Sequence, residues 1–190
     1  MSITEQQLEA SPYKKQINYF MTNFDLMNIF QGCKIVKFAD LELYKDIYEL
    51  LPNKLDFVFI LVETQRNHGH WQLLLRDDNY FEFFDSYGDP PNTILNFIPK
   101  YMMKILGNDY NKDIGHILKS IKRGDKLIIN KYPFQSEVDD VNTCGRWVAL
   151  RIILLLQRSY KNKDVIKYIN GLRKQSKLKN DEVITLIVKI

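Results

Sequence analysis

Asn142-Thr143-Cys144-Gly145-Arg146-Trp147 is followed by an apolar run at 148–156. This stretch predicts a long, largely buried helix that begins at the cysteine, with Asn142 or Thr143 as its cap. A sulfur in the first turn of a helix lies at the positive end of the dipole, which favours the nucleophilic thiolate. Gly145 would leave space for a substrate backbone, and the Cys144 N–H could donate to an oxyanion. A buried cysteine alone is usually a small apolar residue, so the assignment depends on its companions.

The hydrophobic pattern on either side of this helix predicts an α+β domain. Strands are predicted at 57–62, 71–75, 80–84, 126–130 and 183–190. Helical spacing is found at 17–30, 41–51, 94–106 and 143–160, and part of the basic stretch at 158–179 has it too. We therefore expect a single catalytic domain over 1–190, with a central, mostly antiparallel sheet flanked by helices. The nucleophile would lie at the N-terminus of the central helix.

Size and composition are those of a globular protein with its own core: 190 residues, 45% of them hydrophobic. No apolar run approaches the ~20 residues needed to cross a bilayer, so no membrane association is expected. The two cysteines, Cys33 and Cys144, do not make a disulfide framework, and a reducing compartment is expected. Zinc-ligand spacing is absent from the sequence, and we expect neither a metal nor an organic cofactor. A monomer is expected.

The companions of the cysteine include a histidine and a carboxylate. His70 is followed by Trp71 at the start of a predicted strand, where it could act as general base while Trp71 excludes water. His68 is the weaker alternative, and His116 lies in a lysine-rich segment expected at the surface. Asp85 ends the next strand, and a tight antiparallel hairpin would bring it beside His70 to orient the imidazole. The alternative is that Asp85 only caps its own turn.

Gln135 is the third companion, nine residues before Cys144. A side-chain amide there could donate to the oxyanion together with the Cys144 N–H. Losing such a donor costs about 2.7–4 kcal/mol of transition-state stabilisation.

In order, His70-Trp71, Phe84-Asp85-Ser86, Gln135 and Cys144-Gly145 resemble the papain-like superfamily that unites adenain, the adenovirus maturation protease, with the SUMO and other ubiquitin-like-protein proteases. The resemblance covers roughly 57–158 and implies an adenain-like fold. It assigns Cys144 as nucleophile, His70 as base, Asp85 as orienting residue and Gln135 as oxyanion donor. The gap between Gln135 and Cys144 is longer than the family's usual one, which leaves the backbone at 142–143 as an alternative donor.

Cys-Gly-Arg-Trp and the compact length look most like proteases of double-stranded DNA viruses, including virophages and Polinton-like transposons. This resemblance implies an endopeptidase that cleaves capsid or virion precursor proteins, in the virion and in the cytoplasm or viral factory of the host cell. A protease that processes or deconjugates a ubiquitin-like protein is the alternative with the same chemistry.

A basic segment could serve a different function. Residues 158–179 include eight basic residues and one acidic residue, Asp164, which gives this segment a net charge of +7. A solvated helix face is the simplest interpretation, and DNA binding is the functional one. A noncatalytic nucleic-acid-binding protein is thus a further alternative. The candidate contacts are Lys161, Lys163, Lys167, Arg173, Lys174 and Lys177.

Overall fold

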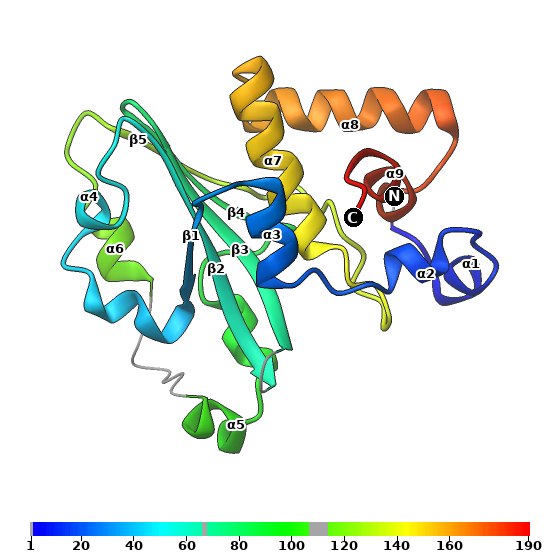
Figure 1. Ribbon diagram of the computed structural model, residues 1–190, viewed down its shortest axis with the longest axis horizontal. Coiled ribbons are helices and arrows are strands. Elements are labelled where there is room, and N and C mark those ends of the chain that lie inside the picture. Colours follow the sequence, from blue (N-terminus) through cyan, green and yellow to red (C-terminus); the bar gives the residue numbers. More distant parts are fainter. Residues whose placement is uncertain (1, 66–67, 107–113) are drawn as a thin grey trace. The chain divides into compact units, whose positions relative to one another are not determined.

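The structure is a computed structural model that describes residues 2–65, 68–106 and 114–190 (Figure 1). Within these residues the chain forms two compact units. Unit 1 comprises Met1–Gln31, Ser86–Gly88 and Tyr132–Ile190, and unit 2 comprises Gly32–Asp85 and Asp89–Lys131. The chain thus passes between the units at four points, and neither unit is one continuous segment. Whether 1–190 acts as a single catalytic domain stays a prediction.

Unit 2 is built on a five-stranded sheet with the order β1-β2-β3-β4-β5. The central strands β2, β3 and β4 form an antiparallel meander, whereas β1 pairs with β2 and β5 with β4 in parallel. The α+β class is confirmed, but the sheet is mixed rather than mostly antiparallel. The edge strands are reached through helical crossovers, which is the connection that parallel pairing requires. The strands are β1 (Lys34–Lys37), β2 (Leu55–Gln65), β3 (His68–Asp77), β4 (Tyr80–Asp85) and β5 (Lys126–Ile129).

One face of this sheet packs against the helices of unit 2. Alternate residues of β2, namely Val58, Ile60 and Val62, point into one apolar core with Leu74 of β3 and Phe83 of β4. The other side of that core comes from the short helices of the crossovers. These are η1 (Phe38–Leu43), α4 (Ile47–Leu50), η2 (Thr93–Phe97), α5 (Lys100–Ile105) and α6 (Gly115–Lys119). The sheet therefore has a rigid backing, which fixes the strands that carry His70 and Asp85.

Unit 1 is helical. Its longest helices are α7 and α8, and α9 contacts both of them as well as α2. Leu8, Ile17 and Val141 contribute to a second apolar cluster in this unit. The helices are α1 (Glu5–Glu9), α2 (Lys14–Ile17), α3 (Asn23–Ile29), α7 (Cys144–Arg158), α8 (Asn162–Ser176) and α9 (Asn180–Ile187). Among the described residues, no helix has the length and apolar character to span a bilayer.

Several predicted elements are shorter or of another type. The helix expected at 17–30 is broken, because Thr22 caps a new helix by accepting from the Asp25 N–H. The helix expected at 41–51 is likewise interrupted by the Asp46 cap of α4. Pro99 separates η2 from α5 within 94–106. The basic stretch, in contrast, is helical through α8.

The strand predicted at 183–190 is wrong, since that segment belongs largely to helix α9. Its β-branched residues suggested a strand, yet Glu182 accepts from the Lys179 N–H at 2.9 Å and closes the first turn. Asp181 and Glu182 also lie at the positive end of the helix dipole. Val183 and Ile184 are buried, so tertiary packing outweighs their weak intrinsic preference for strands.

Candidate functional site

His70 and Asp85 meet in the β3–β4 hairpin. The Nε2 atom of His70 lies 3.0 Å from Oδ2 of Asp85, and both side chains are buried. A carboxylate that accepts from Nε2 selects the tautomer whose lone pair is on Nδ1, the nitrogen that can then take a proton. The expected juxtaposition of these two residues is confirmed. Asp85 does more than cap a turn, because its side chain holds a buried ring.

The register of the hairpin also brings in Gln72, which sequence reasoning missed. Gln72 is the direct cross-strand partner of Asp85, and its Nε2 donates to the same Oδ2 at 2.8 Å. His70 lies two residues earlier on β3 and therefore shares a face with Gln72. The Asp85 side chain is thus contacted by Gln72, which lies directly opposite on the neighbouring strand, and by His70, which lies diagonally opposite. The spacing along β3 was the signal that could have identified Gln72.

Gly69 explains why the strand before His70 takes this path. A Cβ built on Gly69 would lie 2.2 Å from the carbonyl oxygen of Val62 and 2.9 Å from Cα of Glu63. Both obstacles are backbone atoms of β2, and His70 itself pairs with Val62. Only glycine lets the two strands approach this closely, so Gly69 fixes the position from which the imidazole projects.

The other predicted residues of this unit fall as follows. Trp71 is a buried residue of β3, and its role in excluding water stays a prediction. His68 opens β3 but is exposed, which favours His70 as the base. His116 is exposed on α6, as expected, with its Nε2 3.3 Å from the carbonyl oxygen of Tyr44.

Cys144 is the first residue of α7, as predicted, and is almost fully buried. Neither expected cap is made. The Thr143 hydroxyl does not cap α7 but donates to Asp181, and the Asn142 amide donates to the backbone oxygen of Asn18. The N–H groups at the start of α7 are therefore not capped by either side chain. An uncapped helix start is a position that favours an anion, such as a thiolate or an oxyanion. Gly145 is buried beside Cys144, and its contact with substrate stays a prediction.

Gln135 lies in the segment that leads to α7, and its side chain is buried and held at three points. Its Oε1 accepts from Ser86 Oγ at 2.8 Å, and its Nε2 donates to the Val141 carbonyl at 2.8 Å. The second N–H is directed at the Tyr87 hydroxyl, 3.2 Å away. As an oxyanion donor, Gln135 would exchange that neutral contact for a charge-assisted one, which is the stronger bond. The sequence marked Ser86 only as part of the Phe84-Asp85-Ser86 motif and gave no sign of its contact with Gln135, whose backbone N–H also donates to the Ser86 carbonyl at 2.9 Å.

Asp181 of α9 is a fully buried carboxyl that contacts the residue before Cys144. It receives hydrogen bonds from Thr143, which precedes the cysteine, and from Ser136, which follows Gln135. Desolvation raises the pKa of this carboxyl, and the hydrogen bonds from Ser136 and Thr143 only partly oppose that rise. No sequence signal marked it, because an acidic residue in the first turn of a helix is ordinary.

These residues form two sets, one in each unit. The structure brings His70, Gln72 and Asp85 together in unit 2. In unit 1 it ties the Gln135 side chain to the segment that ends at Cys144. Both cysteines of the chain are free thiols, and burial raises the pKa of Cys33. That His70 and Cys144 act on one substrate is a prediction taken up under the proposed function.

The comparison with known proteins adds a viral relative. The uncharacterized protein V9 of Sputnik virophage is 33% identical over 179 residues, which cover 91% of this chain and 98% of the relative. The chain belongs to the V9 family. This membership supports a viral, virophage-type origin and the viral context expected from the sequence. No family model and no solved structure matches the chain.

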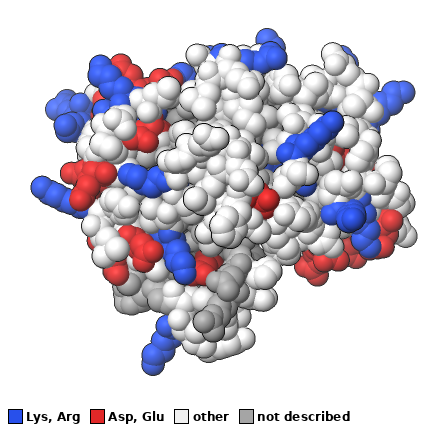
Figure 2. Space-filling view, viewed as in Figure 1, with Lys and Arg blue, Asp and Glu red and all other residues white. Residues whose placement is uncertain are grey.

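The basic candidates of this V9-family chain lie on and around α8. Lys163, Lys167, Lys174 and Lys177 are exposed, whereas Lys161 and Arg173 are partly buried. On the face in Figure 2, positive side chains are interspersed with acidic ones. Their contact with nucleic acid stays a prediction.

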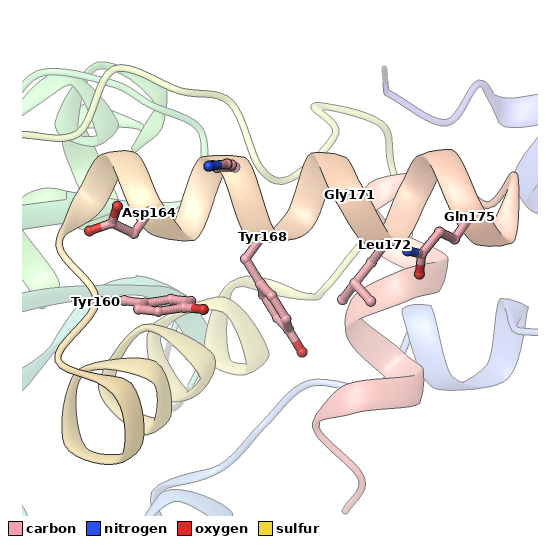
Figure 3. A pocket seen from close by; sticks show the side chains of 7 residues that line it. Tyr160, Asp164, Tyr168, Gly171, Leu172 and Gln175 are labelled. Atoms are coloured by element: carbon pink, nitrogen blue, oxygen red, sulfur yellow. The ribbon is translucent and has the colours of Figure 1, made fainter.

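A cavity of about 440 Å³ adjoins these residues on α8. Figure 3 shows Tyr168 and Leu172 projecting from the same side of the helix, on which the ring of Tyr160 also lies. The guanidinium carbon of Arg158 lies 5.9 Å from the Tyr160 ring centre and 5.6 Å from that of Tyr168. Lys167 and Asp164 line the cavity as well. Aromatic faces beside cations are therefore available on this surface.

Proposed function

We propose that this V9-family protein is a cysteine endopeptidase that cleaves capsid or virion precursor proteins during particle maturation. The observation that carries the proposal is the buried contact between His70 Nε2 and Asp85 Oδ2 at 3.0 Å. A buried histidine held by a carboxylate is expensive to desolvate, and orienting a general base is the function that such a pair serves in hydrolases. The cysteine at the uncapped start of α7 supports the same chemistry.

In the proposed reaction the Cys144 thiolate attacks the scissile carbonyl carbon, and a carbon–sulfur bond forms as the carbonyl oxygen becomes an oxyanion. The Cys144 N–H and the Gln135 amide stabilise that oxyanion. The carbon–nitrogen bond then breaks, and the amine leaves with a proton from the His70 imidazolium. Water attacks the acyl-enzyme, gives its proton to His70 and releases the carboxylic acid with the thiolate regenerated. Asp85 keeps the imidazole in the tautomer that this cycle needs.

The viral relative supports a viral origin. We propose that the substrate is a virion protein and that the enzyme acts as a monomer in the reducing environment of the infected cell. The experiment incubates the protein with recombinant structural proteins of the virus that encodes it and identifies new chain termini by mass spectrometry. The wild type should generate discrete termini, whereas Cys144→Ala should generate none while keeping its circular dichroism spectrum. Cys33→Ala is the matched control and should cleave as the wild type does. Cleavage by Cys144→Ala would end the proposal.

The same preparation tests whether the two units contribute to one site. At pH 6 the Cys144 thiol of the wild type should react with iodoacetamide at least tenfold faster than that of His70→Ala, because an imidazolium stabilises the thiolate. Equal rates would contradict joint action of His70 and Cys144. Rapid labelling by SUMO or ubiquitin vinyl sulfone would redirect the substrate assignment to a ubiquitin-like protein.

The α8 surface favours a second function, namely nonspecific nucleic-acid binding. Exposed lysines supply charge for phosphates, and Tyr160 and Tyr168 supply faces on which bases can stack. Such binding should weaken steeply with salt. Fluorescence anisotropy with a labelled DNA oligonucleotide at 50 and 200 mM NaCl tests it. A double variant, Lys163→Glu with Lys167→Glu, should weaken binding at least tenfold, and salt-independent or unchanged binding would remove this function.

A further inference from the structure

A single buried carboxylate holds both ends of the segment between Gln135 and Cys144. Oδ2 of Asp181 accepts from Ser136 Oγ at 2.6 Å and from the Ser136 N–H at 3.2 Å. Oδ1 accepts from Thr143 Oγ1 at 2.7 Å. The carboxylate comes from α9, 45 residues beyond Ser136 in sequence. All of these groups belong to unit 1.

The two residues that Asp181 holds are the immediate neighbours of the two expected oxyanion donors. Ser136 follows Gln135, whose side-chain amide is one donor, and Thr143 precedes Cys144, whose N–H is the other. Residues 130–143 form no helix or strand. Backbone bonds tie Gln135 to the Ser86 carbonyl and Asn142 to the Ile17 carbonyl. Ser136 and Thr143, at the two ends of the segment, are held by side-chain contacts such as this one.

Thr143 also shows what the contact costs. Its hydroxyl lies at the cap position of α7, where a threonine typically stabilises the helix by ~1 kcal/mol. Here it donates to Asp181 instead, and the helix start is left without that cap. A buried carboxylate is itself costly to desolvate. Two local losses of stability at one point indicate a functional constraint on this geometry.

We propose that Asp181 is a positioning residue that sets the distance between the Gln135 amide and the Cys144 N–H, so that both donate to one oxyanion. The inference rests on the proposed cysteine protease chemistry. It differs from a purely structural role, in which Asp181 would only dock α9.

The test compares two reactions at the same sulfur. In acylation by p-nitrophenyl acetate, the Cys144 sulfur bonds to the carbonyl carbon through an oxyanion, and p-nitrophenolate leaves with its electron pair. In alkylation by iodoacetamide, the sulfur displaces iodide and no oxyanion forms. Both rate constants are measured in a Cys33→Ser background, so that Cys144 is the thiol observed. The ratio of acylation to alkylation therefore reports on the oxyanion donors and not on general access to the sulfur.

Asp181→Asn and Thr143→Val should each lower that ratio at least tenfold, because a lost or misplaced oxyanion donor reduces acyl transfer by up to 10²–10³-fold. Thr143→Ser keeps the hydroxyl and should restore the wild-type ratio. Ser11→Ala is the matched control: Ser11 Oγ donates to Glu182 Oε1 at 2.7 Å, so it anchors α9 through a residue other than Asp181. It should leave the ratio unchanged.

The outcomes separate the two proposals. If the wild type cleaves virion proteins but Thr143→Val and Asp181→Asn keep the wild-type ratio, the positioning role is wrong and the protease remains. A parallel fall of both rate constants, or an equal effect of Ser11→Ala, would likewise reduce Asp181 to a structural anchor. If Asp181→Asn fails to fold, Thr143→Val decides alone. A wild type that cleaves nothing and acylates no faster than it alkylates overturns both proposals.

Discussion

Replacing Gly69 by alanine is the sharpest local perturbation that the β2–β3 pairing allows. The new Cβ would lie 2.2 Å from the Val62 carbonyl oxygen and 2.8 Å from its carbonyl carbon. Ordinary contact between such atoms requires more than 3.4 Å, so one strand must move by more than ~1 Å. The obstacle is backbone, and no side-chain rotation can relieve it.

The expected loss of unfolding free energy in Gly69→Ala has two contributions. Overpacking in a well-packed region costs about 1–3 kcal/mol, and stretching one ladder hydrogen bond adds about 1 kcal/mol. Gly69→Ala should therefore lose about 2–4 kcal/mol of unfolding free energy. His70 is the next residue and pairs with Val62, so its ring should shift by a comparable distance. Misplacement of a catalytic group by ~1 Å reduces turnover about 10²-fold.

Urea denaturation followed by circular dichroism measures the loss of unfolding free energy. Acylation by p-nitrophenyl acetate measures the effect of the displaced His70 ring on the reaction rate. Gly171→Ala is the matched control, because a Cβ at this position of α8 meets no atom within 4 Å. In a helix interior, alanine is favoured over glycine by about 1 kcal/mol, so this variant should be slightly more stable and fully active. Surface substitutions usually change the unfolding free energy by no more than about 0.5 kcal/mol. If the unfolding free energy of Gly69→Ala lies within about 0.5 kcal/mol of the wild-type value, the close approach of β2 and β3 is not what requires glycine.

Three further substitutions test other contacts. Gln72→Leu removes a donor to Asp85 but also an Oε1 atom that has no partner among the described residues. A lost hydrogen bond to a charged group costs about 1.5–3 kcal/mol, and removal of the unpaired Oε1 offsets part of that cost, so the unfolding free energy should change by less than about 1 kcal/mol. The acylation rate should fall about 3–10-fold. A stability loss without a rate loss would contradict an orienting role. Ser86→Ala removes the donor to Gln135 Oε1. The acylation-to-alkylation ratio should then fall about tenfold, which corresponds to about 1.4 kcal/mol. An unchanged ratio would show that the Gln135 amide is held without Ser86. For Asp181, a folded pKa raised above the ordinary 3.8 means that the folded state holds the proton more tightly than the unfolded state. Its stabilising contribution is present below pH 3.8 and is lost as the pH rises through the folded pKa, with a slope of at most about 1.4 kcal/mol per pH unit. The unfolding free energy of the wild type relative to Asp181→Asn should thus decline over that range, and a difference independent of pH would show that the pKa is not raised.

The candidate residues of the β3–β4 hairpin could be predicted from sequence because their geometry is local. Strand length and turn position determine which residues of β3 and β4 face each other, and both strands are marked by dense apolar and aromatic runs. The pairing of His70 with Asp85 follows once the turn is located. Gln72 required one further step, the exact register, which places it rather than His70 directly opposite Asp85.

Helix α9 could not be predicted by the same means. Its run of valine and isoleucine matches a strand, and the residues that close its first turn are polar groups found equally in loops. What makes it a helix is the burial of Val183 and Ile184 in unit 1, and that burial is invisible in a pattern of eight residues. Asp181 was missed for the same reason, because only burial distinguishes it from a solvated helix-start acid.

The two sets of candidate residues, one in each unit, are therefore specified in different ways. The imidazole and its carboxylate depend on the register of one meander, which contiguous residues determine and a backed sheet makes rigid. The segment between Gln135 and Cys144 has no ladder of its own, and its ends depend on a carboxylate from α9. Substitutions in the hairpin should consequently act on the proposed general base and its carboxylate, close to where they are made. Substitutions in α9, by contrast, should act on the proposed oxyanion donors at a distance in sequence, through Ser136 and Thr143, without changing the sheet that carries His70.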